Sequence, residues 1–412
     1  MDYIVSGKYP LNGKLRVYGA KNAVLPILAG SILGGVVFLK NCPRLSDVSY
    51  TLEILRRLGC RVAESGDEII INPAPANSWR LDAGPAGEMR SSVNFLGALI
   101  GRYGRAELPM PGGCRLGSRP IDLHIKAFRE MGVEVDVSGG IIYAEGQPRG
   151  TDVHLDFPSV GATENVILAA VTAKGITTLS NAAREPEIAD LCNFLSAMGA
   201  RIHGAGTATV RIEGVPFLRG CEYSVMPDRI VAATYMCAAV AAGGEIEIEN
   251  VIRPHLEAVA DALRRCGAEI YFSSYGAAVR APRVIHSPGI VRTEVYPGFP
   301  TDCQSQLMAV MACGRESGVI VENIFESRFK IVPELRRMGA EIRCQGPTAI
   351  VRGGSLHGCE LKAEDLRGGA ALVIAALGAE GESRISGTDY IARGYQDLAG
   401  ELRSVGARIS IQ

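Results

Sequence analysis

Aromatic residues and an excess of one charge are both scarce in this sequence of 412 residues. It has a single Trp, 6% aromatic residues and a formal net charge of -1. Proteins that bind single strands use aromatic stacking platforms, and proteins that bind duplexes neutralise many phosphates. We therefore expect no nucleic-acid partner, although a local basic cleft is compatible with this balance. Hydrophobic residues make up 47% of the chain, which excludes intrinsic disorder.

Long apolar runs and paired cysteines are also absent. The sequence has no run of 18 apolar residues, so it predicts no membrane span. Its eleven cysteines form no CxxC pair, and they are scattered through apolar stretches such as residues 235–237. Such cysteines are typical of buried, reduced thiols in a cytoplasmic protein. We therefore expect a cytoplasmic protein without a membrane partner.

Common cofactor and metal motifs are missing as well. The sequence has no GxxxxGK[ST] phosphate loop, no dinucleotide-binding glycine pattern and no GxSxG turn. Its six histidines are dispersed, without a second ligand at the spacing of a metal site. The sequence therefore predicts no cofactor and no metal.

The strongest feature that is present is an internal repeat. An amphipathic stretch that stops at a glycine, followed by a β-branched residue, recurs six times at intervals of about 70 residues. A glycine in the left-handed conformation commonly ends a helix, and a β-branched residue favours a strand. The six instances are LRRLGCRV (55–62), FREMGVEV (128–135), LSAMGARI (195–202), LRRCGAEI (263–270), LRRMGAEI (335–342) and LRSVGARI (402–409).

A second pattern keeps the same interval. Six stretches rich in small apolar residues each follow a polar or charged start, and they are apolar nearly all round, which predicts buried helices. Their Ala and Gly residues would allow close helix packing. These stretches cover residues 21–33, 90–100, 163–173, 228–242, 301–312 and 365–377.

The repeats predict the domain organisation. Few residues follow Gly406, whereas 20 residues precede Lys21, so we expect the N-terminal segment to supply strands to the last repeat. The sequence thus predicts an α/β protein of six repeats of about 69 residues. Three repeats form a domain over residues 21–228. The other three form a domain over residues 229–412, completed by residues 1–20. A cleft between domains is a common ligand site.

The starts of the buried helices carry cations. A helix N-terminus has free N–H groups and a partial positive charge, so it favours anions and disfavours a nearby cation. Lys21, Arg90, Arg229 and Arg367 occupy such starts, which indicates phosphorylated or carboxylated ligands. The alternative is ordinary helix capping by the Ser, Thr and Asp residues beside them.

The segment of residues 109–124 is rich in glycine and proline, which predicts a mobile loop. Cys114 lies inside it, and Arg115 and Arg119 follow closely. Nearby cations favour a thiolate and lower the pKa of a cysteine. Cys114 is therefore a candidate acid or nucleophile, and the alternative is a solvent-exposed thiol without a role.

Several specific motifs occur along the chain in this order: GAKNAVLPIL, PGGCRLGSRPIDLH, SVGATEN, NAAREPEI, PDRI, FPTDCQSQ, FESRF, DLRGGA and RGY. Together, they resemble the UDP-N-acetylglucosamine enolpyruvyl transferase family. The resemblance covers essentially the whole chain. It implies a two-domain inside-out α/β barrel and a role in peptidoglycan synthesis.

The resemblance implies a role for specific residues. Cys114, Asp302, Lys21 and Arg393 correspond to the catalytic groups. The phosphoenolpyruvate-binding residues are Lys21, Asn22, Arg119 and Arg393. The contacts to UDP-N-acetylglucosamine are Arg90, Arg119, Pro120, Ile121, Asp122, Leu123, Phe157, Pro158, Ser159, Val160, Gly161, Asp302 and Ile324. The residues of domain closure are Arg229, Arg328, Asp365 and Arg367.

The implied reaction transfers the enolpyruvyl group of phosphoenolpyruvate to the 3′-hydroxyl of UDP-N-acetylglucosamine and releases phosphate. It needs a proton at the methylene carbon and removal of a proton from the alcohol, so two groups with separated pKa values are expected. Asp302 corresponds to the base. Cys114 is assigned as the acid and as the target of fosfomycin, and whether it or Lys21 delivers the proton stays open.

Two other functions are compatible with parts of the sequence. One is a related transferase with a different acceptor, against which the segment around Cys114 argues. The other is an inactive relative that binds the UDP-sugar and regulates the pathway. The presence of Lys21, Cys114, Asp302 and Arg393 together argues against that function.

Overall fold

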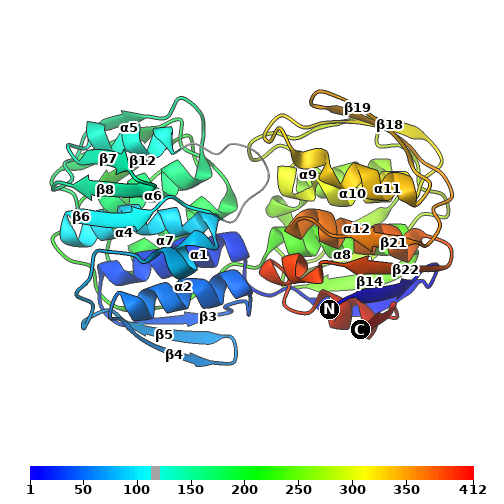
Figure 1. The fold of residues 1–412 in the computed structure, drawn as a ribbon, viewed down its shortest axis with the longest axis horizontal. Helices are drawn as coiled ribbons and strands as arrows, with labels where there is room; N and C mark the ends of the chain where they lie inside the picture. The colour runs from blue at the N-terminus through cyan, green and yellow to red at the C-terminus, as the bar shows by residue number, and fades with distance from the viewer. Residues whose placement is uncertain (113–120) are drawn as a thin grey trace. The chain divides into compact units, whose positions relative to one another are not determined.

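The computed structural model describes residues 1–112 and 121–412 of the chain. The described residues divide into two compact units (Figure 1). The first unit contains residues 19–112 and 121–226, and the second unit contains residues 1–18 and 227–412. The boundaries predicted from the sequence lie two residues later at both places.

Three buried helices form the centre of the first unit. They pack on one another, and their side chains are almost all buried because the sequence is apolar on every face. Glycine allows the close approach of two of these helices: a Cβ atom at Gly97 would lie 2.4 Å from the carbonyl oxygen of Asn165. The central segments are α1 (Lys21–Gly30), η1 (Ser31–Leu33), η2 (Arg90–Val93), α4 (Asn94–Tyr103) and α6 (Val160–Ala170).

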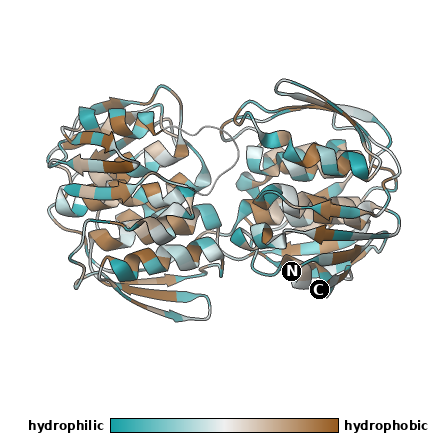
Figure 2. Ribbon diagram, in the orientation of Figure 1, coloured by the Kyte–Doolittle hydropathy of each residue, from teal (hydrophilic) through white to brown (hydrophobic). Residues whose placement is uncertain are grey.

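The outer helices of the first unit are amphipathic. Each buries apolar residues, and α2 and α5 expose charged residues on the opposite face. Figure 2 shows teal and brown residues together along them. They are α2 (Ser46–Arg57), the short α3 (Ala83–Gly87), α5 (Asp122–Glu130) and α7 (Pro186–Ala197).

Among the described residues, three sheets accompany these helices, with strand orders β13-β3-β5-β4, β6-β8-β7 and β11-β12-β10-β9. In the second of them, the isolated parallel bridge between Arg80 and Glu107 takes the place of a fourth strand. The strands are β3 (Val37–Lys40), β4 (Arg61–Ser65), β5 (Glu68–Asn72), β6 (Arg105–Pro109), β7 (Glu134–Ser138), β8 (Ile141–Glu145), β9 (Asp152–His154), β10 (Ile176–Ser180), β11 (Arg201–His203), β12 (Thr209–Glu213) and β13 (Cys221–Ser224).

The second unit follows the same plan. Its buried helices α8 (Arg229–Ala242), α10 (Gln304–Ala312) and α12 (Leu366–Gly378) pack on one another. No helix among the described residues is long and apolar enough to span a bilayer. The remaining helical segments are η3 (Arg253–His255), α9 (Glu257–Arg265), η4 (Thr301–Cys303), η5 (Arg328–Ile331), α11 (Val332–Arg337), η6 (Thr388–Arg393) and α13 (Leu398–Ser404).

The sheets of the second unit have the strand orders β21-β22-β1-β23, β15-β16-β14-β2 and β17-β18-β20-β19. The strands are β1 (Tyr3–Ser6), β2 (Leu11–Arg16), β14 (Gly244–Glu249), β15 (Glu269–Phe272), β16 (Gly276–Arg280), β17 (Ile290–Arg292), β18 (Ser317–Val321), β19 (Glu341–Gln345), β20 (Thr348–Arg352), β21 (Glu360–Lys362), β22 (Glu382–Ser386) and β23 (Arg408–Ile411).

The N-terminal segment contributes to two different sheets. Strand β1 pairs antiparallel with β22 and β23, in the last part of the chain, as expected. Strand β2, in contrast, pairs in parallel with β14, so the expectation that all of residues 1–20 completes the last repeat is wrong for this strand. Strand β2 takes the edge position that β13 and β17 take in their own sheets, where each also pairs in parallel.

Two local features recur at equivalent places. The six glycines predicted to end helices all have positive φ, between 80° and 105°, which confirms that prediction. Asn41, Asn181 and Asn250 follow β3, β10 and β14, and they have φ values of 57°, 55° and 59°. Each donates from its side-chain amide to a backbone carbonyl, at 2.7 to 2.8 Å, on a neighbouring chain segment. Asparagine tolerates this left-handed conformation better than most residues.

Candidate functional site

Lys21, at the start of α1, forms an almost buried ion pair. Its Nζ lies 2.8 Å from Oδ2 of Asp47, and the two side chains are 13% and 3% exposed. Asp47 lies in the first turn of α2, where a carboxylate is favoured by the helix dipole. No side chain caps α1, so the alternative of ordinary capping does not explain Lys21. Asp47 instead fixes the position of this cation.

Side-chain capping does explain three of the other helix starts. Ser159 accepts a hydrogen bond from the backbone N–H of Ala162 in α6. Asp228 and Asp365 cap α8 and α12 in the same way. Thus Asp365, for which the resemblance implied a role in domain closure, has a structural role at the start of α12.

A polar network crosses the otherwise apolar interior of the first unit. Asn165 Nδ2 lies 3.1 Å from Nδ1 of His124 and donates to the carbonyl of Gly161 at 3.1 Å. Asn94 Nδ2 donates to Oε2 of Glu164 at 2.8 Å. The network joins α4, α5 and α6, and four of these residues, Asn94, His124, Glu164 and Asn165, are buried.

Burial changes the acidity of two members of the network. Desolvation lowers the pKa of His124 to about 4, and the nearby charge of Arg90 adds to this effect. Desolvation also raises the pKa of Glu164 to about 8, against the hydrogen bond from Asn94. Both groups are therefore uncharged near neutral pH.

The structure brings together two of the segments that were predicted to contact a UDP-sugar. Ile121 precedes α5, and Asp122 and Leu123 begin it, while Val160 and Gly161 begin α6. The two helices pack together, and a Cβ atom on Gly161 would lie 3.3 Å from Cε1 of His124. Phe157 and Pro158 precede α6, and Phe157 is 47% exposed. Cys114, Arg115, Arg119 and Pro120 lie outside the described residues.

Asp302 is held between two arginines in the second unit. Its Oδ1 lies 2.5 Å from Nη2 of Arg328, and its Oδ2 lies 3.3 Å from Nη2 of Arg367. The arginine side chains are 3% and 5% exposed, whereas that of Asp302 is 27% exposed. Burial acts to raise the pKa of Asp302, but the charges of Arg367 and Arg328 outweigh it and hold the pKa far below the usual range.

Other bonds fix both arginines in place. Arg328 donates from Nε and Nη2 to the carbonyl of Thr301, at 3.3 and 3.2 Å. Arg367 donates from Nη1 to the hydroxyl of Tyr395 at 3.3 Å, and that hydroxyl lies 2.7 Å from Oγ1 of Thr234. The two guanidinium groups are therefore preorganised around one partly exposed carboxylate.

Glu322 organises the backbone beside Asp302. This buried carboxylate accepts from the hydroxyl of Thr301 at 3.0 Å and from that of Thr293 at 2.9 Å. It also accepts from the backbone N–H groups of Ile324, at 2.9 Å, and Phe325, at 3.1 Å. It thereby links the turn that carries Asp302 to Ile324, a predicted contact of the UDP-sugar.

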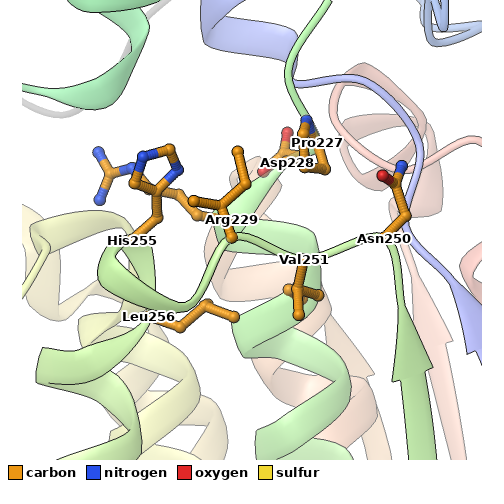
Figure 3. Close-up of a pocket in the computed structure, with 9 residues that line it drawn as sticks. Pro227, Asp228, Arg229, Asn250, Val251, His255 and Leu256 are labelled. Atoms are coloured by element: carbon orange, nitrogen blue, oxygen red, sulfur yellow. The ribbon is translucent and has the colours of Figure 1, made fainter. Parts of the chain in front are cut away.

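A small hollow lies at the start of α8 and next to Arg229 (Figure 3). Figure 3 shows the Arg229 side chain beside the ring of His255. The empty space in this hollow is about 160 Å³, part of it open solvent, and no enclosed space in it holds a water-sized sphere. The hollow alone is therefore too small to enclose a nucleotide sugar. Among the described residues, no group of three or more His, Cys, Asp or Glu side chains is arranged to hold a metal ion.

Sequence reasoning missed several residues that organise these groups. Asp47, Glu322, Tyr395 and Asn165 had no predicted role. A signal was available for Asn165, because a polar residue in the middle of an apolar helix needs a buried partner. The contacts of Asp47 and Glu322 join segments that are distant in the sequence, and no local pattern indicates them. Arg393 is half-buried at the end of η6.

Comparison with known proteins places the chain in a family. The sequence model of EPSP synthase (3-phosphoshikimate 1-carboxyvinyltransferase) matches residues 5–402. UDP-N-acetylglucosamine 1-carboxyvinyltransferase 2 of Caldanaerobacter subterraneus is 46% identical over 98% of both chains. UDP-N-acetylglucosamine 1-carboxyvinyltransferase of Solidesulfovibrio magneticus is 47% identical, again over 98% of both chains.

Solved structures agree on the fold. The enolpyruvyl transferase NikO of Streptomyces tendae has a TM-score of 0.89 at 24% identity, over 99% of this chain and 98% of its own. An EPSP synthase of Acinetobacter baumannii has a TM-score of 0.77 at 20% identity, over the full length of both chains. These likenesses confirm the predicted two-domain inside-out α/β class. The chain belongs to the EPSP synthase family of carboxyvinyltransferases, and within it to the UDP-N-acetylglucosamine 1-carboxyvinyltransferases.

Proposed function

We propose that this enzyme transfers the enolpyruvyl group of phosphoenolpyruvate to the 3′-hydroxyl of UDP-N-acetylglucosamine and releases phosphate, the first committed step of peptidoglycan precursor synthesis. The observation that carries the proposal is the identity of 44–47%, over nearly the full chain, to several relatives named UDP-N-acetylglucosamine 1-carboxyvinyltransferase. The two groups of charged residues, around Lys21 and around Asp302, support it.

Phosphoenolpyruvate carries a phosphate and a carboxylate, so its site requires fixed cations. We assign Lys21, Asn22, Arg119 and Arg393 to this site. The ion pair of Lys21 with Asp47 supports the assignment, because a cation held in place loses little freedom when an anion binds. The positive end of the α1 helix dipole favours an anion at the same point.

The UDP-sugar is assigned to Arg90, residues 119–123, residues 157–161 and Ile324. The contact of α5 with α6 supports a single subsite that contains the described parts of both segments. The first turn of α6 offers N–H groups to an anion such as a diphosphate. The exposed ring of Phe157 offers an apolar face beside them.

The addition step needs an acid and a base. The 3′-hydroxyl loses its proton and its oxygen bonds to the central carbon of phosphoenolpyruvate, while the methylene carbon gains a proton. In the elimination step the carbon–oxygen bond to phosphate breaks and a proton leaves the new methyl group. We assign Asp302 as the base and Cys114 as the acid, with Lys21 as the alternative acid.

The two arginines around Asp302 bear on its role. While both guanidinium groups neutralise it, Asp302 is ionised but a weak base. A substrate anion beside Arg328 and Arg367 would share their charge and raise the pKa of Asp302. Substrate binding would thus make Asp302 a stronger base at the time when the hydroxyl must lose its proton.

Roles in domain closure are proposed for Arg229, Arg328, Asp365 and Arg367. Closure would exclude water from the addition intermediate. Small-angle scattering with and without UDP-N-acetylglucosamine tests this part of the proposal. Compaction on binding supports closure, and unchanged dimensions contradict it.

The test of the reaction is phosphate release from phosphoenolpyruvate. The proposal expects release that depends on UDP-N-acetylglucosamine. A transferase with another acceptor would give no release with this one. A regulatory relative would bind the UDP-sugar without releasing phosphate from the donor.

A further inference from the structure

The orientation of the Asn165 side-chain amide is fixed by a backbone donor. The N–H of Gly97 lies 2.7 Å from Oδ1 of Asn165. A backbone N–H can only donate, so the atom that faces it must be the amide oxygen. The amide nitrogen therefore faces the opposite side, where it lies 3.1 Å from the carbonyl oxygen of Gly161 and 3.1 Å from Nδ1 of His124.

This orientation determines the protonation state of His124. Asn165 has an N–H to donate, so Nδ1 of His124 must accept it. A ring nitrogen accepts only when it carries no proton, which leaves the proton of the neutral ring on Nε2. Protonation of Nδ1 would bring two donors face to face.

The surroundings of His124 also favour the neutral ring. The residue is 4% exposed. Arg90 disfavours a second positive charge, Asp122 on the same helix favours one, and the buried Glu164 lies further along the network through Asn94. Desolvation dominates, and the pKa of His124 falls to about 4.

The Nε2–H of His124 lies at the proposed subsite of the UDP-sugar. Within the residues that the structure describes, His124 is hydrogen-bonded only to Asn165. The ring contacts Gly161 so closely that a Cβ atom there would lie 3.5 Å from Nε2. This N–H is therefore available to donate to a bound ligand.

We propose that Asn165 is a positioning residue that holds His124 as the neutral Nε2–H tautomer, so that it donates to an acceptor oxygen of the nucleotide sugar. The ligand in this inference rests on the function proposed above. The tautomer itself does not, and it can be measured in the protein without substrate.

Two-bond proton–nitrogen NMR correlations of the histidine rings test the tautomer. The His124→Gln variant identifies the His124 signals by their loss. The unmodified protein should show a pyridine-like Nδ1 and a pyrrole-like Nε2, unchanged between about pH 6 and pH 8. In Asn165→Asp, one carboxylate oxygen still faces Gly97. The other replaces the amide nitrogen, where it opposes the carbonyl of Gly161 and can accept from Nδ1, so His124 should gain a proton on Nδ1.

Steady-state kinetics test the role of the tautomer. We expect Asn165→Asp to raise the KM for UDP-N-acetylglucosamine at least about 10-fold while changing the KM for phosphoenolpyruvate much less. Thr163→Val is the matched control, because Thr163 is buried on the same helix and its hydroxyl accepts from the N–H of Ala183 at 3.0 Å. It should lower Tm without changing the His124 signals or either KM.

Different results overturn different claims. A proton on Nδ1 of His124 in the unmodified protein overturns the inference, even if Asn165→Asp fails to fold. Equal effects of Asn165→Asp and Thr163→Val on the KM for UDP-N-acetylglucosamine overturn the positioning role. No phosphate release by the unmodified protein with this acceptor overturns the proposed function instead, and the NMR result then still decides the tautomer.

Discussion

Oδ2 of Asp302 lies 3.3 Å from Nη2 of Arg367, and this contact joins the η4 turn to the first turn of α12. Arg328 binds the other carboxylate oxygen. The pKa of Asp302 is therefore low in the protein without substrate. The strength of Asp302 as a base depends on whether another anion shares the charge of the two guanidinium groups. The same contacts also contribute to the stability of the second unit.

Asp302→Asn removes the proposed base and leaves two buried cations unneutralised. Loss of a general base should lower kcat by roughly 10²- to 10⁴-fold. The free energy of unfolding should fall by about 2 kcal/mol, less than for fully buried pairs because Asp302 is partly exposed. Steady-state kinetics and thermal unfolding measure the two effects. Asp261→Asn is the control, since Asp261 is 68% exposed and pairs with Arg265 on the surface.

Full turnover by Asp302→Asn would contradict the assignment of the base. Unchanged stability would show that the two arginines find other partners in the variant. The Asp261→Asn control should change the free energy of unfolding by less than about 0.5 kcal/mol.

Glu322→Gln should weaken the backbone beside Asp302. Four of the described hydrogen bonds go to Oε1 of Glu322 and one, from the hydroxyl of Thr301, goes to Oε2. Gln can keep the first four, but it loses the negative charge that strengthens them. We expect a loss of about 1–3 kcal/mol in the free energy of unfolding and a higher KM for UDP-N-acetylglucosamine, because Ile324 loses its anchor. Denaturant unfolding and kinetics measure both. Glu341→Gln, at a site that is 71% exposed, is the control, and equal effects of the two variants would contradict the role.

Glu164 should make the protein less stable as pH rises. Burial raises its pKa from the usual 4.5 to about 8, so between these values the native state holds a proton that the unfolded state has lost. The contribution of Glu164 to the free energy of unfolding is therefore fully present below about pH 4.5, and it is lost as pH rises through about 8. Glu164→Gln keeps an acceptor for Asn94 and removes the titration.

Thermal unfolding of Glu164→Gln between pH 5 and pH 8.5 measures this effect. The fall in Tm with rising pH should be smaller than in the unmodified protein. It should not vanish, because burial also raises the pKa of Glu401 to about 7 and that of Asp190 to about 6. The exposed Glu130→Gln serves as the control. If the Tm of the unmodified protein, Glu164→Gln and Glu130→Gln changed with pH in the same way, the claim that Glu164 is buried and protonated would be contradicted.

Cys114→Ser tests the residue assigned as acid and as target of fosfomycin. Loss of an acid should lower turnover by about 10²-fold or more, and a serine hydroxyl lacks the nucleophilic thiolate. We expect the variant to resist inactivation by fosfomycin. Cys344→Ser, at an exposed cysteine, should keep both properties. Unchanged turnover together with unchanged sensitivity would remove Cys114 from its assigned role.

The sequence predicted the buried helices well because their signal is local. The stretch at residues 228–242 forms α8 (Arg229–Ala242) and the stretch at residues 365–377 forms α12 (Leu366–Gly378). Apolar residues on every face and a capping Asp before each are properties that the sequence alone displays. The start of α6 was predicted three residues late, because the cap at Ser159 begins the helix at Val160, before the stretch that starts at Thr163.

The contacts within the candidate site could not be predicted in the same way. Arg328 begins η5, and Arg367 lies in the first turn of α12. No local sequence pattern indicates that both arginines bind Asp302. Strand β2 looked like part of the last repeat, and only its parallel pairing with β14 shows its place. Such contacts depend on how distant segments pack, which a local pattern does not encode.

The most direct test of the proposed function measures phosphate and product together. The purified protein is given phosphoenolpyruvate with UDP-N-acetylglucosamine, with 3-phosphoshikimate, or with no acceptor. We predict phosphate release only with the UDP-sugar, in equal amount to a product whose mass corresponds to one added enolpyruvyl group. Release only with 3-phosphoshikimate, or no release with any acceptor, would contradict the proposal.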